Sequence, residues 1–249
     1  MIQYFQIKNL CKYFGGLHAV DNLCFSVKKN SITGLIGPNG AGKTTAFNLI
    51  SHFLPRDKGD ILFQNENLKK LPAYILVRKG IIRTFQQIRL FPNLTIRENL
   101  LLALSKNYDG WWTSFFPINE AKKNEEIEIS LQKFDLEKLI DEKAEDLSYG
   151  QSRIIEILQK KLTGADFILL DEPASGINPT RLLEIEKLLL ELKSNGKTIL
   201  IIEHNMNFIM KMCDEIIVME NGKVLLQDTP QAVQKNQKVL EAYLGKNNK

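Results

Sequence analysis

The chain has 249 residues, of which 44% are hydrophobic and 25% are charged, and its formal net charge is +4. This is the composition of an ordinary globular protein, and without a clustered basic stripe it argues against a nucleic-acid partner. The three cysteines are scattered and contain no C-x-x-C pair, which favours reduced thiols over a disulfide framework or a zinc site. Because the sequence has neither a signal-peptide pattern nor an apolar run of membrane-spanning length, we expect the chain not to enter a membrane by itself.

The first part of the chain combines short strand patterns with a glycine-rich loop. Strands are predicted at Tyr4–Ile7, Leu23–Val27 and Asp60–Phe63. A further apolar strand, Ser31–Ile36, leads directly into the loop, and a helical run, Thr45–Ile50, follows it.

This loop matches the phosphate-binding pattern G-x-x-x-x-G-K-[ST], in the strand–loop–helix context that the pattern requires. The candidate ATP-binding residues are Gly37, Pro38, Asn39, Gly40, Ala41, Gly42, Lys43, Thr44 and Thr45. Glycines allow the backbone to point N–H groups at phosphate oxygens, and the positive end of the helix dipole faces the anion. We expect Lys43 to reach the β- and γ-phosphates and the Thr44 hydroxyl to bind Mg²⁺.

The middle of the chain has a different character. A short helix near Ala73–Arg78 and a strand near Ile81–Phe85 precede charged sequence with helical periodicity, from about residue 95 to 162. This pattern predicts a helical subdomain inserted between strands of the sheet. Within it, the aromatic cluster Trp111–Phe116 has two interpretations: a hydrophobic clasp inside the subdomain, or an exposed patch that touches a membrane partner or lipid headgroups.

Two carboxylates follow the apolar strand Phe167–Leu170. Buried parallel strands are apolar throughout, and sites lie beyond their carboxyl ends. Asp171 is therefore placed to hold Mg²⁺, directly or through water, opposite Thr44, and Glu172 is the candidate general base for the attacking water. His204 follows the next strand, where it could bind the γ-phosphate and hold Glu172 and water in place.

The remaining histidines, His18 and His52, have no such setting and are interpreted as structural. The rest of the chain alternates strands and helices, which predicts an α/β fold with a parallel core sheet and helices on both faces. These strands are predicted at Thr198–Ile202, Ile216–Met219 and Lys223–Gln227, and the helices at Arg181–Lys193, at Met206–Met212 and after Thr229-Pro230.

One segment distinguishes among nucleotide hydrolases. Residues 147–151 read L-S-Y-G-Q and resemble the L-S-G-G-Q signature of ATP-binding-cassette (ABC) ATPases. The helix that opens here has its N-terminal dipole and Ser148 available for an anion. The resemblance implies a single ABC ATP-binding domain over residues 1–249. Its implied fold is that of a P-loop NTPase with a parallel-sheet core, an N-terminal antiparallel β subdomain and an inserted α-helical subdomain at about residues 88–162.

The resemblance also implies roles for single residues. Phe14 resembles the aromatic residue that stacks on adenine, with packing in the core as the alternative. Gln86 resembles the glutamine that senses Mg²⁺ and the γ-phosphate, and His204 resembles the switch histidine. Asn178 lies in a segment that resembles the loop communicating across a dimer, where Asp is more usual.

In this family two cassettes close head to tail, so that the signature of one completes the ATP site of the other. The signature residues implied to act on the partner's ATP are Ser148, Tyr149, Gly150 and Gln151, with Tyr149 in place of the usual glycine. The implied cofactors are ATP and Mg²⁺. The implied catalytic residues are Lys43, Gln86, Glu172 and His204, and the implied metal ligands are Thr44, Gln86 and Asp171.

Further segments are similar to the ATPases of branched-chain amino acid importers. They are F-G-G at 14–16, R-T-F-Q at 83–86, R-L-F at 89–91, I-E-H at 202–204 and E-A-Y-L-G at 241–245. Such an ATPase pairs with a second ABC ATPase or a copy of itself, lies peripherally on the cytoplasmic face of the inner membrane, and works with integral membrane permeases and, indirectly, an external substrate-binding protein. The alternatives are the ATPase of a urea or short-amide importer, that of a lipopolysaccharide exporter, and a soluble ABC ATPase outside transport.

Overall fold

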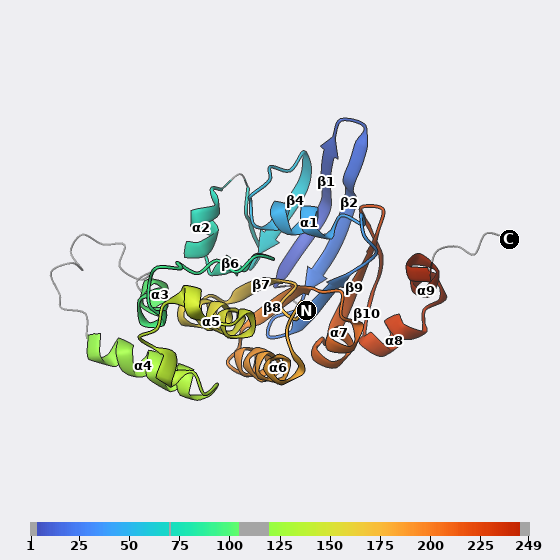
Figure 1. Ribbon diagram of the computed structural model, residues 1–249. Coiled ribbons are helices and arrows are strands. Elements are labelled where there is room, and N and C mark those ends of the chain that lie inside the picture. Colours follow the sequence, from blue (N-terminus) through green and yellow to red (C-terminus); the bar gives the residue numbers. More distant parts are fainter. Residues whose placement is uncertain (1–3, 70, 105–119, 245–249) are drawn as a thin grey trace. The chain divides into compact units, whose positions relative to one another are not determined.

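The computed structural model describes residues 4–69, 71–104 and 120–244 (Figure 1). Within these ranges the chain forms two compact units. The first contains the chain up to residue 83, residues 166–175 and the chain from residue 190, and the second contains residues 84–165 and 176–189. The aromatic cluster Trp111–Phe116 lies outside the described residues. None of the described helices is long and apolar enough to span a membrane.

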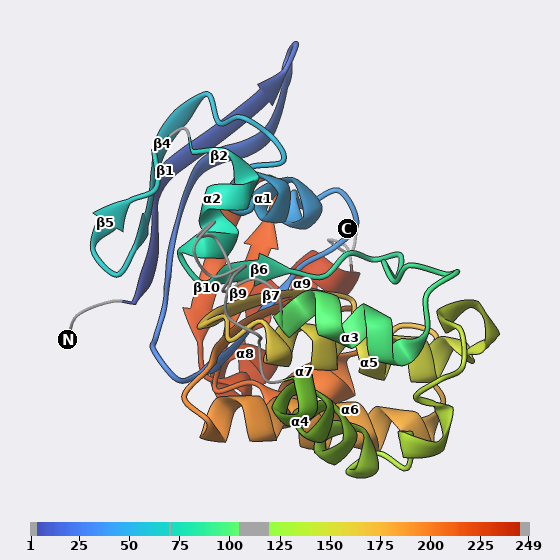
Figure 2. The same cartoon turned by 90° about the vertical axis from the view of Figure 1, so that its left-hand side faces the viewer.

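The strands of the first unit form two sheets. An antiparallel sheet has the order β2-β1-β4-β5 (Figure 2) and consists of β1 (Phe5–Phe14), β2 (Leu17–Val27), β4 (Lys58–Phe63) and β5 (Glu66–Asn67). A second sheet has the order β10-β9-β3-β8-β7-β6 and consists of β3 (Ile32–Ile36), β6 (Ile81–Arg83), β7 (Phe167–Asp171), β8 (Thr198–Ile202), β9 (Glu215–Glu220) and β10 (Lys223–Asp228). Neighbours from β9 to β6 are parallel, and β10 is antiparallel to β9. The predicted α/β class, with a parallel core and an N-terminal antiparallel part, is confirmed.

Helices connect these strands and build the second unit. Those of the first unit are α1 (Lys43–Ile50), α2 (Ala73–Arg78), α7 (Met206–Met212), α8 (Pro230–Lys235) and α9 (Gln237–Leu244). The second unit contains α3 (Ile96–Leu104), α4 (Glu120–Gln132), α5 (Tyr149–Leu162) and short 3₁₀ turns at Glu137–Leu139 and Ala144–Asp146. Helix α6 (Pro179–Ser194) has residues in both units.

The two faces of the parallel sheet are covered by different elements. Leu200 of β8 shares one buried cluster with Phe47 of α1 and Phe5 of β1, so this face packs against α1 and the antiparallel sheet. On the other face lies α7, because a Cβ atom added to Gly34 of β3 would lie 3.1 Å from the side chain of Ile209. Helix α1, which follows the phosphate loop, is therefore anchored between two sheets.

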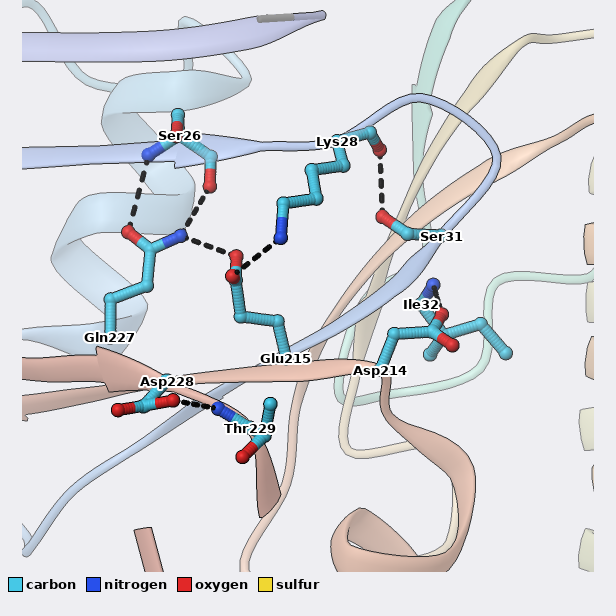
Figure 3. A network of polar contacts seen from close by, with 9 residues as sticks. All are labelled: Ser26, Lys28, Ser31, Ile32, Asp214, Glu215, Gln227, Asp228 and Thr229. Atoms are coloured by element: carbon cyan, nitrogen blue, oxygen red, sulfur yellow. Dashed lines mark hydrogen bonds and ion pairs between the residues drawn. The ribbon is translucent and has the colours of Figure 1, made fainter. Parts of the chain in front are cut away.

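A polar network joins β2 to the edge of the second sheet (Figure 3). The side-chain amide of Gln227, on β10, donates to the carbonyl of Ser26 at 2.7 Å and to the Glu215 carboxylate at 2.6 Å. Lys28 Nζ lies 3.1 Å from the same carboxylate, at Oε1. Side-chain contacts as well as the shared core therefore connect the two sheets.

The first two strands extend further than the sequence predicted. The structure has β1 over Phe5–Phe14 and β2 over Leu17–Val27, where only Tyr4–Ile7 and Leu23–Val27 were expected. Positive φ angles of 49° at Asn9 and 50° at Asn22 accompany register shifts in this pair. Such bulges interrupt the alternation of apolar and polar residues on which the prediction depended.

Candidate nucleotide-binding site

The phosphate loop joins β3 to α1 and needs glycine at two positions. Gly37 has φ 151° and a Cβ atom there would lie 2.2 Å from the carbonyl oxygen of Met219. Gly42, the N-cap of α1, has φ 94°, and a Cβ atom would lie 2.4 Å from the carbonyl oxygen of Ala19. A helix leaves its first N–H groups without intrahelical acceptors, and glycine supplies no side-chain cap. The loop can therefore offer these donors to an anion.

Lys43 closes this loop. Its Nζ donates to the carbonyl of Gly37 at 2.7 Å and to that of Pro38 at 3.0 Å. Burial lowers the pKa of Lys43, and the negative charge of Glu172 opposes that shift. The next residue, Thr44, is exposed in the first turn of α1, so its hydroxyl is accessible to a ligand.

Asp171 ends β7 and forms a buried ion pair. Its Oδ2 lies 2.7 Å from Nη2 of Arg83, and the two side chains are 7% and 5% exposed. Arg83 Nη1 also donates to Asn48 Oδ1 at 2.7 Å and to Ser51 Oγ at 3.1 Å. Arg83 thus connects Asp171 to the helix that carries Lys43. No role of Arg83 was predicted from the sequence, although its place at the end of an apolar strand pattern, three residues before Gln86, was an available signal.

The structure brings Glu172 and His204 together at the carboxyl edge of the sheet. His204 Nε2 lies 2.9 Å from Glu172 Oε1, with the side chains 48% and 15% exposed. Glu172 has φ 49°, a left-handed conformation that is unfavourable for a side chain of its size, and its N–H donates to the Ile202 carbonyl at 2.9 Å. Such strain is frequent at functional sites.

Glu203 holds the backbone on both sides of this pair. Its carboxylate is 2% exposed and accepts hydrogen bonds from the N–H groups of Ala174 at 2.7 Å, His204 at 2.7 Å and Asn205 at 3.0 Å. Hydrogen bonds to a charged acceptor are stronger than neutral ones. Glu203 therefore ties the loop after Glu172 to the segment that carries His204. In the sequence, Glu203 was notable only as part of the I-E-H segment that resembles branched-chain amino acid importers.

We expect Glu203→Gln to lower ATP turnover about tenfold with little effect on ATP affinity. The amide NH₂ cannot accept a hydrogen bond, so at least one backbone N–H loses its partner at a cost of about 1–3 kcal/mol. Glu172 and His204 are then held less firmly, whereas the phosphate loop is untouched. Steady-state turnover and ATP binding are the measurements, with Glu220→Gln, at the end of β9, as the control. Equal turnover in the two variants would contradict this role.

Phe14 lies at the tip of the β1–β2 hairpin and is 48% exposed. Lys12 Nζ lies 5.5 Å from its ring centroid. This exposure favours the adenine-stacking interpretation over packing in the core.

The two histidines interpreted as structural lie in settings that suit this role. His52 has its Nδ1 2.7 Å from the carbonyl oxygen of Leu71, and burial lowers the pKa of His52. His18 packs against Tyr13 in a tilted arrangement, with ring centroids 4.5 Å apart.

Tyr243 of α9 also contacts the phosphate loop. Its hydroxyl shares a hydrogen bond with the backbone of Gly37, and burial raises the pKa of Tyr243 to about 12. From the sequence, this C-terminal segment showed only a family resemblance. A contact between residues so far apart in the sequence has no local pattern that would reveal it.

The second unit carries the signature, which forms a capping box at the start of α5. Ser148 Oγ accepts from the N–H of Gln151 at 3.4 Å, and Gln151 Oε1 accepts from the N–H of Ser148 at 2.9 Å. A Cβ atom on Gly150 would lie 3.1 Å from Arg181 Cγ, so glycine permits the close approach of α6.

Gln86 and Asn178 belong to the second unit too. Gln86 is exposed in the segment that follows β6. Asn178 is exposed, and its Oδ1 accepts from the N–H of Arg181 at 2.9 Å, so it caps α6. Asn and Asp are both good caps, which explains how Asn178 can stand where the family more often has Asp.

The second unit also contains a cavity of about 340 Å³ next to the signature. Its lining residues come from the segment before α3, from the segment directly before α5 and from the start of α5: Ile88, Leu90, Pro92, Ala144, Glu145, Leu147, Tyr149 and Ser152. Asn99, fully buried in α3, fixes the backbone between Leu90 and Pro92, since its side chain accepts a hydrogen bond from the N–H of Phe91 and donates to the carbonyls of Phe91 and Leu94.

Comparisons with known proteins agree with this geometry. A family model described as "ABC transporter" matches residues 20–175, and one described as "Branched-chain amino acid ATP-binding cassette transporter" matches residues 223–247. The chain is 36% identical over 247 residues to the high-affinity branched-chain amino acid transport ATP-binding protein BraF of Pseudomonas aeruginosa, with 96% of this chain and 97% of that protein covered.

Solved structures show the same similarity. One is the ADP conformation of an ATP-binding cassette of an ABC transporter, with a TM-score of 0.84, 33% identity, and coverage of 99% of this chain and 100% of that one. Another is a dimeric cassette in a post-hydrolysis state bound to ADP and Pi, with a TM-score of 0.79, 26% identity, and coverage of 91% and 98%.

Proposed function

Because the chain belongs to the family of ABC transporter ATPases, we propose that it hydrolyses ATP to drive the uptake of branched-chain amino acids through partner permeases. The observation that carries this proposal is the meeting of a complete phosphate loop with the Glu172–His204 pair at one edge of the sheet. The match of the C-terminal residues 223–247 to a branched-chain amino acid cassette model supports the cargo class. We propose further that the two units form a single ATP-binding domain, with the second unit as its helical subdomain.

In this proposal the first unit performs the chemistry on the nucleotide. The loop N–H groups and Lys43 bind the phosphates, and the exposed ring of Phe14 stacks on the adenine. Glu172 takes the proton of the attacking water, and His204, 2.9 Å from its carboxylate, keeps that carboxylate aimed at the water.

Oxygen donors suit Mg²⁺, and the hydroxyl of Thr44 and the carboxylate of Asp171 are donors of this kind. We propose that they hold the ion together with Gln86 of the second unit. When bound, Mg²⁺ neutralises charge that develops on the phosphates.

We propose that the chain works as a dimer, with a second ABC ATPase or a copy of itself, on the cytoplasmic face of the inner membrane. The signature residues would then complete the partner's ATP site, with Asn178 in the loop between the two sites. The cavity lined by Leu90 and Tyr149 is the proposed docking place for a permease segment, since it is concave and combines apolar side chains with polar ones such as Glu145 and Ser152. An external substrate-binding protein would act through the permeases. The ATPase of a urea or short-amide importer is the alternative.

The test is to isolate the tagged chain from gently solubilised membranes of its own cell. Two polytopic permeases and a second cassette ATPase are the expected companions, and their chemistry would distinguish amino acids from urea. Recovery only with soluble or nucleic-acid-bound proteins would overturn the transport function while leaving the ATPase site in place.

We expect Leu90→Glu to lower the recovery of the permeases at least tenfold without loss of ATP binding. The substitution would replace an apolar contact of Leu90 with a desolvated carboxylate, which costs well over about 1.4 kcal/mol. Ile129→Glu is the matched control, because Ile129 is 52% exposed on α4 of the same unit and does not line the cavity. If both variants recover the permeases equally well, the permease does not dock at this cavity.

A further inference from the structure

Arg153 lies one helical turn after Tyr149 on α5, and its side chain is 1% exposed. Complete burial of a charged side chain is costly unless an opposite charge and hydrogen-bond acceptors surround it. Glu156 supplies the charge, with Oε2 2.7 Å from Arg153 Nη1 and a side chain that is 0% exposed. Burial raises the pKa of Glu156, and the positive charge of Arg153 opposes that rise. The two charges are thus kept together inside the second unit.

The guanidinium also holds the backbone at Gln86. Arg153 Nη2 donates to the carbonyl of Gln86 at 2.8 Å, and Nη1 donates to the carbonyl of Phe85 at 3.1 Å. Glu156 Oε1 accepts from the N–H of Arg89 at 3.4 Å. The ion pair therefore fixes the backbone of residues 85–89 at both ends, through Arg153 at residues 85 and 86 and through Glu156 at residue 89. This determines where the Gln86 side chain begins.

Tyr149, in the signature, accepts a hydrogen bond from the same Arg153 nitrogen that binds the backbone of Gln86. Arg153 Nη2, the donor to the Gln86 carbonyl, also donates to the Tyr149 hydroxyl at 2.9 Å. The guanidinium carbon lies 5.6 Å from the Tyr149 ring centroid. Tyr149 is 47% exposed, so a molecule that binds the signature can reach it. Any displacement of its hydroxyl alters the surroundings of the nitrogen that holds Gln86.

We propose that Arg153 is a positioning residue that transmits occupancy of the signature to Gln86, with Tyr149 as the group that senses it. This rests on the proposed function, in which the signature binds the partner's ATP and Gln86 serves the chain's own Mg²⁺. One side chain then couples the two ATP sites of a dimer. The tyrosine has a role here that the usual glycine, without a hydroxyl, does not have.

The test is Tyr149→Phe in the complex recovered with its partners, with ATPase activity measured against Mg²⁺ concentration. Removal of the hydroxyl frees Arg153 Nη2 from one partner and loosens its hold on Gln86, so the Mg²⁺ concentration for half-maximal rate should rise about fivefold. The matched control is Tyr74→Phe, because Tyr74 is exposed and its ring centroid likewise lies 5.6 Å from an arginine carbon, that of Arg78. This control should leave the Mg²⁺ dependence unchanged.

A double variant separates positioning from a merely structural role. In a Gln86→Ala background, Tyr149→Phe should cause no further shift in Mg²⁺ dependence, since the side chain through which it acts is gone. Arg153→Lys, which keeps the charge beside Glu156 but not the fork of donors, should shift the Mg²⁺ dependence in the same direction as Tyr149→Phe.

The proposal is overturned if Tyr149→Phe behaves like Tyr74→Phe, or if its effect persists without the Gln86 side chain. Failure of the proposed function would appear differently, as a lack of Mg²⁺-dependent ATPase activity in the unaltered complex.

Discussion

Glu172→Gln is expected to lower ATP turnover by about 10²–10⁴-fold, the usual scale for the loss of a general base. In the unaltered chain, Glu172 Oε1 lies 2.9 Å from His204 Nε2. The amide of the variant keeps the size of the side chain and an oxygen that His204 can reach, but it cannot take a proton from water. Nucleotide binding should survive, because the phosphate loop does not depend on Glu172. The variant should therefore accumulate as an ATP-closed dimer.

Turnover is measured on the purified complex, and closure by the size of the protein with and without ATP. Glu220→Gln, which alters a carboxylate at the end of β9, should change neither quantity. Near-normal turnover of the Glu172 variant would remove this residue from the role of base.

Arg83→Ala is expected to destabilise the first unit by about 3–5 kcal/mol, the usual cost of removing one partner from a buried ion pair. The substitution leaves the Asp171 carboxylate, 7% exposed, without the guanidinium that lies 2.7 Å away, and it removes the hydrogen bonds to Asn48 and Ser51. Thermal unfolding should show a midpoint lower by about 6–20 °C.

Two further variants show whether the buried charge is the cause. Arg83→Ala combined with Asp171→Asn should regain part of the lost stability, because the uncompensated carboxylate is gone. Arg97→Ala should cost less than about 1 kcal/mol, since Arg97 is paired with the exposed residues Glu128 and Asp141. Equal losses in Arg83→Ala and Arg97→Ala would show that the buried pair has no special role.

Local sequence patterns predicted most of the secondary structure of the first unit. The spans of α2, α7 and β8 agree with the prediction to the residue. The outcome differs where tertiary contacts define the element. The strand predicted at Ile81–Phe85 ends at Arg83, because only Ile81, Ile82 and Arg83 pair with β7. The two-residue strand β5 was missed, since it exists only through its pairing with β4.

The sequence by itself determined the family, the α/β class and the candidate residues of the phosphate loop, Asp171, Glu172 and His204. These depend on residue types at fixed short spacing, which a linear chain displays directly. The family and fold class are confirmed, whereas the roles of the single residues stay predictions.

Only the tertiary structure decided which side chains hold these residues in place. Arg83 meets Asp171, and Arg153 meets Gln86, across 88 and 67 positions of the chain. The Glu203 carboxylate meets the Ala174 N–H across 29 positions of the chain. Contacts of this kind follow from how strands and helices pack, and burial then makes them strong by excluding water. No local pattern contains that information, because the same arginine or glutamate on a surface would contribute little.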